Sequence, residues 1–145
     1  MAQAGPQGAQ KSLRAAATLS AYRVVAPDTA LSVGFVRLIQ IPTETSFILG
    51  IAQQSGTTDQ AVPVISYGYS KVAAGASVSA GSLLTFVTAT GYLIEQANAT
   101  IGTSAASTAG VLQPKLVGVA LQNGANTDAV IEAFISISNF RLRVA

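Results

Sequence analysis

The chain has 145 residues, which predicts one domain large enough to bury a hydrophobic core without disulfides or a structural metal. It contains no cysteine and no histidine, so disulfide frameworks, Cys/His zinc sites, thiol nucleophiles and histidine acid–base chemistry are excluded. Charged residues make up only 10% of the chain, whereas a typical soluble domain has about 25%.

The low charge content favours a subunit of a larger assembly, because charged residues are depleted where surfaces are buried. A net charge of +2 and the lack of a dense Lys/Arg patch argue against nucleic acid as a partner. Residues 72–94 carry no charge, but Gly, Ser and Thr punctuate them, so they predict strands rather than a membrane-spanning helix. The N-terminus lacks the apolar core of a signal peptide. We expect neither a membrane nor a nucleic-acid partner.

Residues 1–22 are rich in Ala, Gly and Gln and show no consistent period. They predict an extended N-terminal arm, followed by a single β-barrel domain over residues 23–145. A solvated tail is the alternative.

From residue 22 onward, eight short segments are rich in Val, Ile, Leu, Phe or Tyr and are bounded by turn-forming residues. No segment holds a helical apolar stripe for three turns. The chain is therefore predicted to be all-β, with strands within residues 22–26, 34–41, 47–53, 61–67, 82–88, 91–97, 116–122 and 130–138.

Two parts of the chain repeat one another. Gly50, Ala52, Gln54 and Gly56 match Gly118, Ala120, Gln122 and Gly124 at one constant offset, and Thr58-Asp59 then matches Thr127-Asp128. When the comparison is extended toward the N-terminus, Ser32–Ile39 resembles Ser79–Phe86, and Gly34 is aligned with Gly81. The predicted pseudo-repeats are therefore about 32–66 and 79–136. Residues 97–114 are an Ala/Ser/Thr/Gly-rich loop insertion. We expect the two repeats to close against one another as a small, pseudo-symmetric β-barrel or sandwich without free edges.

The repeated glycines have predicted structural roles. Gly50 and Gly118 lie inside apolar strands, which indicates a kink with another strand crossing closely; approach of a ligand is the less favoured reading. Gly56 and Gly124 lie in turns and are expected to supply positive φ angles.

The repeated aspartates, Asp59 and Asp128, are expected to bond local backbone amides at the start of the following strand. A pseudo-symmetric acid–base dyad is the sharper alternative. However, Thr precedes each Asp, whereas in aspartic proteases Thr or Ser and then Gly follow it. Turn capping is favoured.

Other catalytic motifs are missing from the sequence. Lys11, Lys71 and Lys115 lack the glycine context of a phosphate-binding loop, and the serines have no histidine base. The six acidic residues do not cluster into a calcium loop. We expect no enzymatic activity, no cofactor and no metal.

The pattern resembles a known family. A Gly-led strand, a "LGIA" or "VGVA" strand, a Gly-containing turn and an apolar strand occur twice, joined by "YGYSKVAAGASVSAGSLL". Over about residues 28 to 137 this resembles the capsid cement (decoration) proteins of tailed bacteriophages, and more closely the family with two repeats. The resemblance implies a β-barrel on the outer surface of an icosahedral virion, usually a homotrimer, which binds the major capsid protein and stabilises the expanded shell.

Three basic residues near the N-terminus, Lys11, Arg14 and Arg23, are the expected contacts to the capsid or to a neighbouring subunit. A tail or spike β-module and a host- or carbohydrate-binding module are the alternatives. A carbohydrate binder would expose aromatic platforms, for which Tyr67, Tyr69 and Tyr92 are the candidates. We expect these tyrosines instead to pack in the core or at a subunit interface.

Overall fold

The computed structural model describes residues 8–28, 38–40, 42, 47–87, 90–96 and 116–138. These residues contain strands and no helix, which confirms the all-β prediction. The strands are β1 (Gly8–Ala15), β2 (Val24–Pro27), β3 (Leu38–Gln40), β4 (Gly50–Ala52), β5 (Ala61–Ala73), β6 (Leu83–Phe86), β7 (Leu93–Glu95), β8 (Leu116–Ala120) and β9 (Val130–Ser138).

Each of the eight predicted segments overlaps one strand, from β2 to β9 in chain order, although β2 ends at Pro27 and β5 continues to Ala73, beyond the predicted ends at 26 and 67. The predicted insertion over residues 97–114 lies outside the described residues, as does Gly34.

Strand β1 corrects the prediction that residues 1–22 form an arm outside the barrel. Residues 8–14 pair antiparallel with β5, from Gly8 opposite Gly68 to Arg14 opposite Ala61, with one register shift after Ala9. Leu13 and Ala15 point into the core while Ser12 and Arg14 face solvent. The alternation of a half-buried strand is therefore present, but small and polar residues make it weak.

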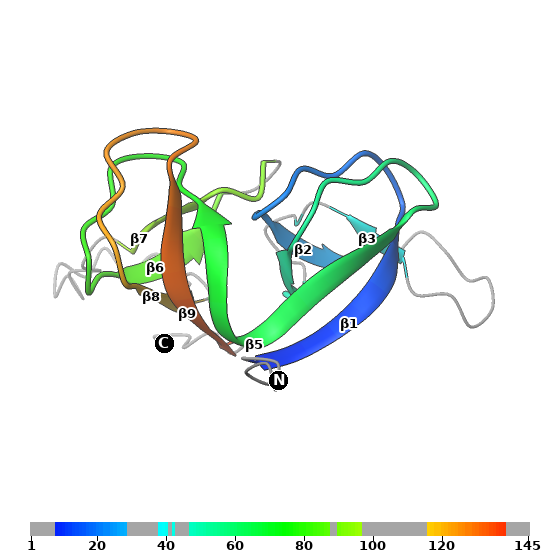
Figure 1. The fold of residues 1–145 in the computed structure, drawn as a ribbon, viewed down its shortest axis with the longest axis horizontal. Coiled ribbons are helices and arrows are strands. Elements are labelled where there is room, and N and C mark those ends of the chain that lie inside the picture. The colour runs from blue at the N-terminus through cyan, green and yellow to red at the C-terminus, as the bar shows by residue number, and fades with distance from the viewer. Residues whose placement is uncertain are drawn as a thin grey trace, which may run out of the picture.

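The first five strands close a ring. The order is β1-β3-β2-β4-β5, and the pairing of β1 with β5 joins the two ends. Within this ring β1 and β3 are parallel, and the other pairs are antiparallel. The ring forms the first barrel, on the right in Figure 1.

The second barrel uses the other half of β5. From Tyr67 onward β5 pairs with β9, and the order continues through β8 and β6 to β7. A parallel bridge between Ala74 and Leu93 brings β7 back to the end of β5 and nearly closes this ring. In Figure 1 the long, bent β5 runs through both barrels. Each repeat therefore forms its own barrel, rather than one half of a common barrel.

Matching hydrogen bonds show which residues are equivalent in the two repeats. Leu19 forms an antiparallel bridge with Gly56, as Val78 does with Gly124. The Asp59 amide donates to Ala15 O as the Asp128 amide donates to Ala74 O, both at 2.8 Å.

These equivalences correct the backward extension of the repeat. Counted from the two bridges, the counterpart of Ser79–Phe86 is 20–27, not Ser32–Ile39. Tyr22 stands where the second repeat has Gly81, and both have a positive φ, 64° and 89°. The first repeat thus begins inside the segment predicted as an arm.

Gly50 and Gly118 allow a close approach between strands. A Cβ on Gly50 would lie 2.2 Å from the backbone oxygen of Ile65, and one on Gly118 would lie 2.1 Å from that of Phe134. Real Cβ atoms do not approach a carbonyl oxygen so closely, so each glycine lets its strand press against β5 or β9.

The prediction that the turn glycines supply positive φ angles is wrong. Gly56 and Gly124 do not have positive φ; Asp59 and Asp128 carry it instead, at 68° and 69°. Aspartate tolerates this left-handed conformation better than most residues. Glycine is needed at position 56 because there is no room for a side chain: a Cβ there would lie 2.6 Å from Cγ2 of Val62 under the turn.

Two hydrophobic clusters make up the core. One lies inside the first barrel and consists of Leu13, Ala15, Leu19, Val25, Ala52, Val62 and Val64. The other fills the second barrel and extends between the barrels, where it includes Val24, Ile48 and Ile51.

Glu95, at the end of β7, holds the turn that leads into β6. Its Oε1 accepts hydrogen bonds from the Ser79 amide and, at 2.9 Å, from Ser82 Oγ. These hydrogen bonds lower the pKa of the Glu95 carboxyl, and the bond from the Ser79 amide has the largest effect.

We predict that Gly118→Val destabilises the fold by about 1–3 kcal/mol, because the side chain would displace β9. The midpoint of denaturant unfolding should fall accordingly. Ala61→Val, at an exposed strand position, is the control and should change stability by less than about 0.5 kcal/mol. An unchanged midpoint for Gly118→Val would show that the close approach is not a constraint.

Candidate functional site

The three predicted contact residues occupy different environments. Lys11 is exposed on β1. Arg14, on the same strand, forms an ion pair with Asp59, with Nη2 and Oδ1 3.2 Å apart. Arg23 lies between the barrels, and its side chain is only 22% exposed. The structure therefore does not bring the three cations together as one basic surface that faces outward.

Arg23 is the centre of a junction cluster that also contains Tyr92 and Asp128. Its guanidinium carbon lies 3.8 Å from the centroid of the Tyr92 ring. Its Nη2 donates to Tyr92 Oη at 2.6 Å and lies 3.8 Å from Asp128 Oδ1. Arg23 belongs to the first repeat and its two partners to the second, so the cluster fastens one barrel to the other.

The hydroxyl of Tyr92 donates a hydrogen bond to Asp128 Oδ1. This bond, together with burial, raises the pKa of Tyr92, and the Arg23 charge partly opposes the rise. The cluster therefore holds a neutral tyrosine between an anion and a cation.

Neither aspartate serves an acid–base dyad in this arrangement. Asp59 pairs with Arg14 and Asp128 with Arg23, at the same turn position of two different barrels. Their carboxylates tie turns to neighbouring strands, a structural role that differs from the predicted bonds to local amides.

Main-chain hydrogen bonds reinforce the junction. The Val24 amide donates to Gly91 O at 2.9 Å, and the Ala73 amide donates to Tyr22 O at 2.8 Å. A Cβ on Gly91 would lie 2.8 Å from Val24 O, so this glycine is needed for the contact, and its positive φ of 74° also favours glycine.

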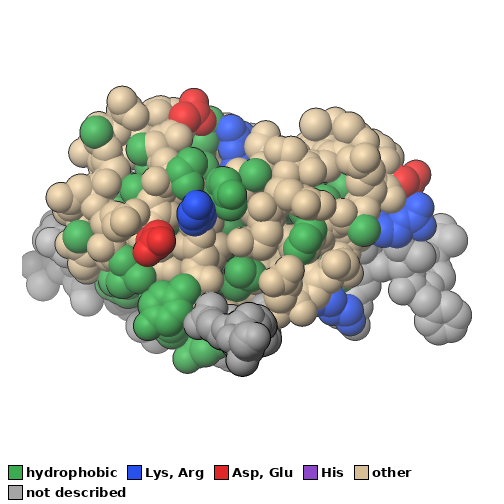
Figure 2. Space-filling model, in the orientation of Figure 1, with side chains coloured by type: hydrophobic (Ala, Val, Ile, Leu, Met, Phe, Trp, Pro, Cys, Tyr) green, Lys and Arg blue, Asp and Glu red, His purple; other side chains and the backbone are tan. Residues whose placement is uncertain are grey.

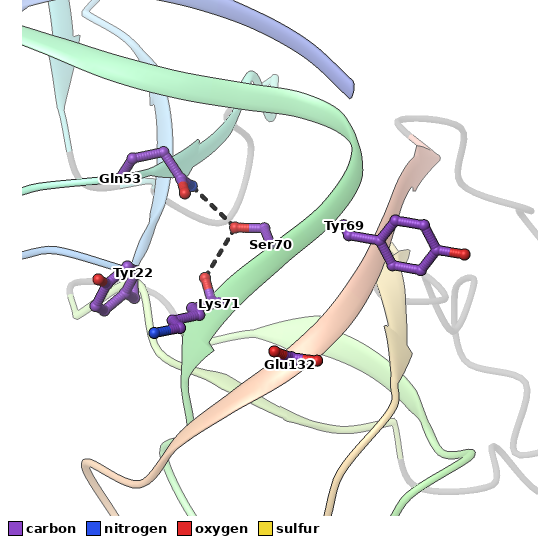
Figure 3. Close-up of a pocket in the computed structure, with 6 residues that line it drawn as sticks. All are labelled: Tyr22, Gln53, Tyr69, Ser70, Lys71 and Glu132. Atoms are coloured by element: carbon purple, nitrogen blue, oxygen red, sulfur yellow. Dashed lines mark hydrogen bonds between the residues drawn. The ribbon is translucent and has the colours of Figure 1, made fainter. Parts of the chain in front are cut away.

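A shallow groove of about 370 Å³ lies beside this junction. It is lined by Tyr22, Gln53, Tyr69, Ser70, Lys71 and Glu132 (Figure 3). Gln53 Nε2 donates to Ser70 Oγ at 2.9 Å, and Ser70 Oγ donates to the Lys71 carbonyl. Lys71 and Glu132 face each other across β5 and β9. The groove offers hydrogen-bonding groups, but its six side chains contain no nucleophile with a base positioned to activate it.

An aromatic cluster lies on the outer surface of β5 and β9, so of the two predicted placements for Tyr67 and Tyr69, core or subunit interface, the first is wrong. Tyr67 and Tyr69 are more than half exposed rather than in the core, and each packs edge-on against Phe134 with ring centroids 5.4 and 5.3 Å apart. In Figure 2 hydrophobic side chains gather over β9 and the middle of β5. Alternation along β5 could have indicated this exposure, because Tyr67, Tyr69 and Lys71 share one face. Tyr92 packs under Arg23 instead.

Within the described ranges, no three His, Cys, Asp or Glu side chains come together as metal ligands. The same residues contain no helix long and apolar enough to span a bilayer.

We predict that Arg23→Gln lowers the free energy of unfolding by about 1–2 kcal/mol, because it removes a cation–π contact and charge-assisted hydrogen bonds. The matched control is Arg14→Gln, which breaks the more exposed ion pair and should cost less than about 1 kcal/mol. Chemical denaturation of both variants measures the difference. Equal losses would contradict the assignment of Arg23 as the link between barrels.

The sequence matches neither a protein-family profile nor a curated protein. The fold is similar to a solved structure, the N base of the head fibre gp8.5 in bacteriophage phi29. The TM-score is 0.60 at 18% sequence identity, and the match covers 92% of this chain and 97% of that chain. The likeness therefore extends over nearly the whole of both chains and establishes a shared fold.

Proposed function

We propose that this chain is a structural protein of a bacteriophage virion, which binds the outer surface of the head as a homotrimer and stabilises the expanded shell. The observation that carries the proposal is the likeness to a phage head-fibre base over nearly the whole of both chains. The sequence resemblance to capsid cement proteins points to the same kind of particle. The proposal has a general part, a structural role in the virion, and a specific part, the role of a cement protein. A role as the base of a head fibre is the alternative to the cement role.

The physical chemistry of the chain supports a structural role. Of the side chains that could carry charge, Arg14 and Arg23 are held by carboxylates of the same chain, and the groove contains no activated nucleophile. A protein that binds only the expanded lattice stabilises that lattice by mass action, without a catalytic group. Association into a trimer would add affinity through multivalency.

Among the three predicted contact cations, we assign the capsid contact to Lys11. Its neighbour Arg14 already pairs with Asp59, and Arg23 lies in the junction cluster. Lys11 is exposed on β1, three residues after the strand begins at Gly8.

The direct test is binding of the purified chain to heads of the phage that encodes it, after this chain has been stripped from them. We expect saturable binding to expanded heads, little binding to unexpanded ones, and a higher temperature of head disruption after binding. Electron microscopy would place the bound chain on the outer surface.

A tail or spike module would instead bind isolated tails, and a carbohydrate-binding module would be retained by host glycans. Either result, with no binding to heads, would contradict the proposal.

We predict that Lys11→Glu weakens head binding by up to about fivefold and reduces its salt sensitivity, as expected when one exposed ion pair is lost. Thr58→Glu, which adds a negative charge at an exposed turn position of the first barrel, is the control and should bind as the parent does. Identical binding of the two variants would remove Lys11 from the interface.

A further inference from the structure

The outer face of the second barrel carries an unbroken row of four apolar side chains. Tyr69 lies opposite Phe134, Phe134 opposite Val119, and Val119 opposite Leu83, so the row crosses β5, β9, β8 and β6. Tyr69 is 57% exposed and Leu83 48% exposed, with Phe134 and Val119 partly exposed between them. We call these four residues the apolar row.

Such a row is unusual on the solvent side of a sheet. Antiparallel sheets that cover a core on one face normally carry polar side chains on the other. Contiguous apolar surface on the outside of a protein commonly marks a binding surface. On one side the row is bordered by the paired Lys71 and Glu132, as at the polar rim of an interface, and on the other by Ser136 and the exposed Tyr67, which packs against Phe134.

The first barrel shows what can cover this row. The equivalent positions there are Gln10, Ile65, Ile51 and Val24, which are aligned across β1, β5, β4 and β2 by the same pairings. Val24 and Ile51 are completely buried, and they belong to the hydrophobic cluster that contains the core of the second barrel. In the first repeat the β2 and β4 end of this surface is therefore a contact between barrels, while Ile65 is partly exposed and Gln10 is exposed.

We infer that the apolar row is the surface through which copies of this chain associate, with a second copy as its occupant. The first barrel buries two of the four equivalent positions, Val24 and Ile51, at the junction within the chain, whereas their counterparts in the second barrel, Leu83 and Val119, are left exposed or partly exposed. A contact between unlike surfaces of successive copies can close into a ring. The inference deepens the homotrimer part of the proposed function by naming the surface that joins the subunits.

The test measures the mass of the full chain in solution, without capsids, by sedimentation velocity and light scattering. The variant is Leu83→Glu, and the control is Phe47→Glu, which places the same charge at an apolar position that is 58% exposed in the first barrel. The parent and the control should form the oligomer. Leu83→Glu should remain folded and raise the dissociation constant at least about tenfold, because it buries a charge in the interface.

A second measurement does not depend on a charged substitution. The chain has no cysteine, so Leu83→Cys introduces a unique thiol, and Phe47→Cys is its control. Alkylation of Cys at position 83 should be slowed at least about tenfold when the protein is concentrated enough to associate, and alkylation at position 47 should not.

A monomeric parent, or an oligomer that is unaffected by Leu83→Glu with an unprotected thiol at position 83, would overturn the inference. An intact oligomer that has lost head binding in Leu83→Glu would also overturn it, by assigning the row to the capsid. The outcome is independent of the proposed function, because a head-binding protein could associate through another surface, and an oligomer formed through this row could fail to bind heads.

Discussion

Strand β5 belongs to both barrels, and this sharing constrains the rest of the chain. Its first half pairs with β1 and β4, and its second half with β9. Neither barrel can lose β5 without opening its own ring. The junction also depends on this strand, because the Ala73 amide at its end donates to Tyr22 O. The Arg23 cluster lies beside the same junction and adds side-chain contacts between the repeats.

Sequence patterns predicted the all-β class and strands β2 to β9, because these strands carry large apolar residues between clear turns, but they did not predict that each repeat forms its own barrel. Strand β1 was missed because Leu13 is its only large buried side chain and Lys11, Ser12 and Arg14 dominate its composition. The repeat was aligned in the wrong place at its start because Tyr22 replaces Gly81, so the glycine that would have marked the equivalence is missing. A nearby Gly34 then offered a false match.

The candidate surfaces were harder to predict for a different reason. Whether an apolar residue in a barrel strand lies in the core or outside depends on which strands flank it and on what covers the barrel. Val24 and Leu83 have similar chemistry and equivalent positions, yet the first is buried at the junction and the second is exposed. The arginines illustrate the same limit, since their partners come from turns that are distant in sequence.

We propose that the surface of this chain serves assembly. Arg14 and Arg23 are paired with carboxylates of the same chain, the six side chains that line the groove include no nucleophile with a positioned base, and the apolar row is exposed.

Native-state hydrogen exchange tests the shared strand most directly. If β5 couples the two barrels, amides in β1, in both halves of β5 and in β9 should exchange through one opening, with the same free energy as global unfolding. Exchange from β8 and β9 at a clearly lower free energy, while β1 and the first half of β5 stay protected, would show that the barrels open independently. That result would contradict the account.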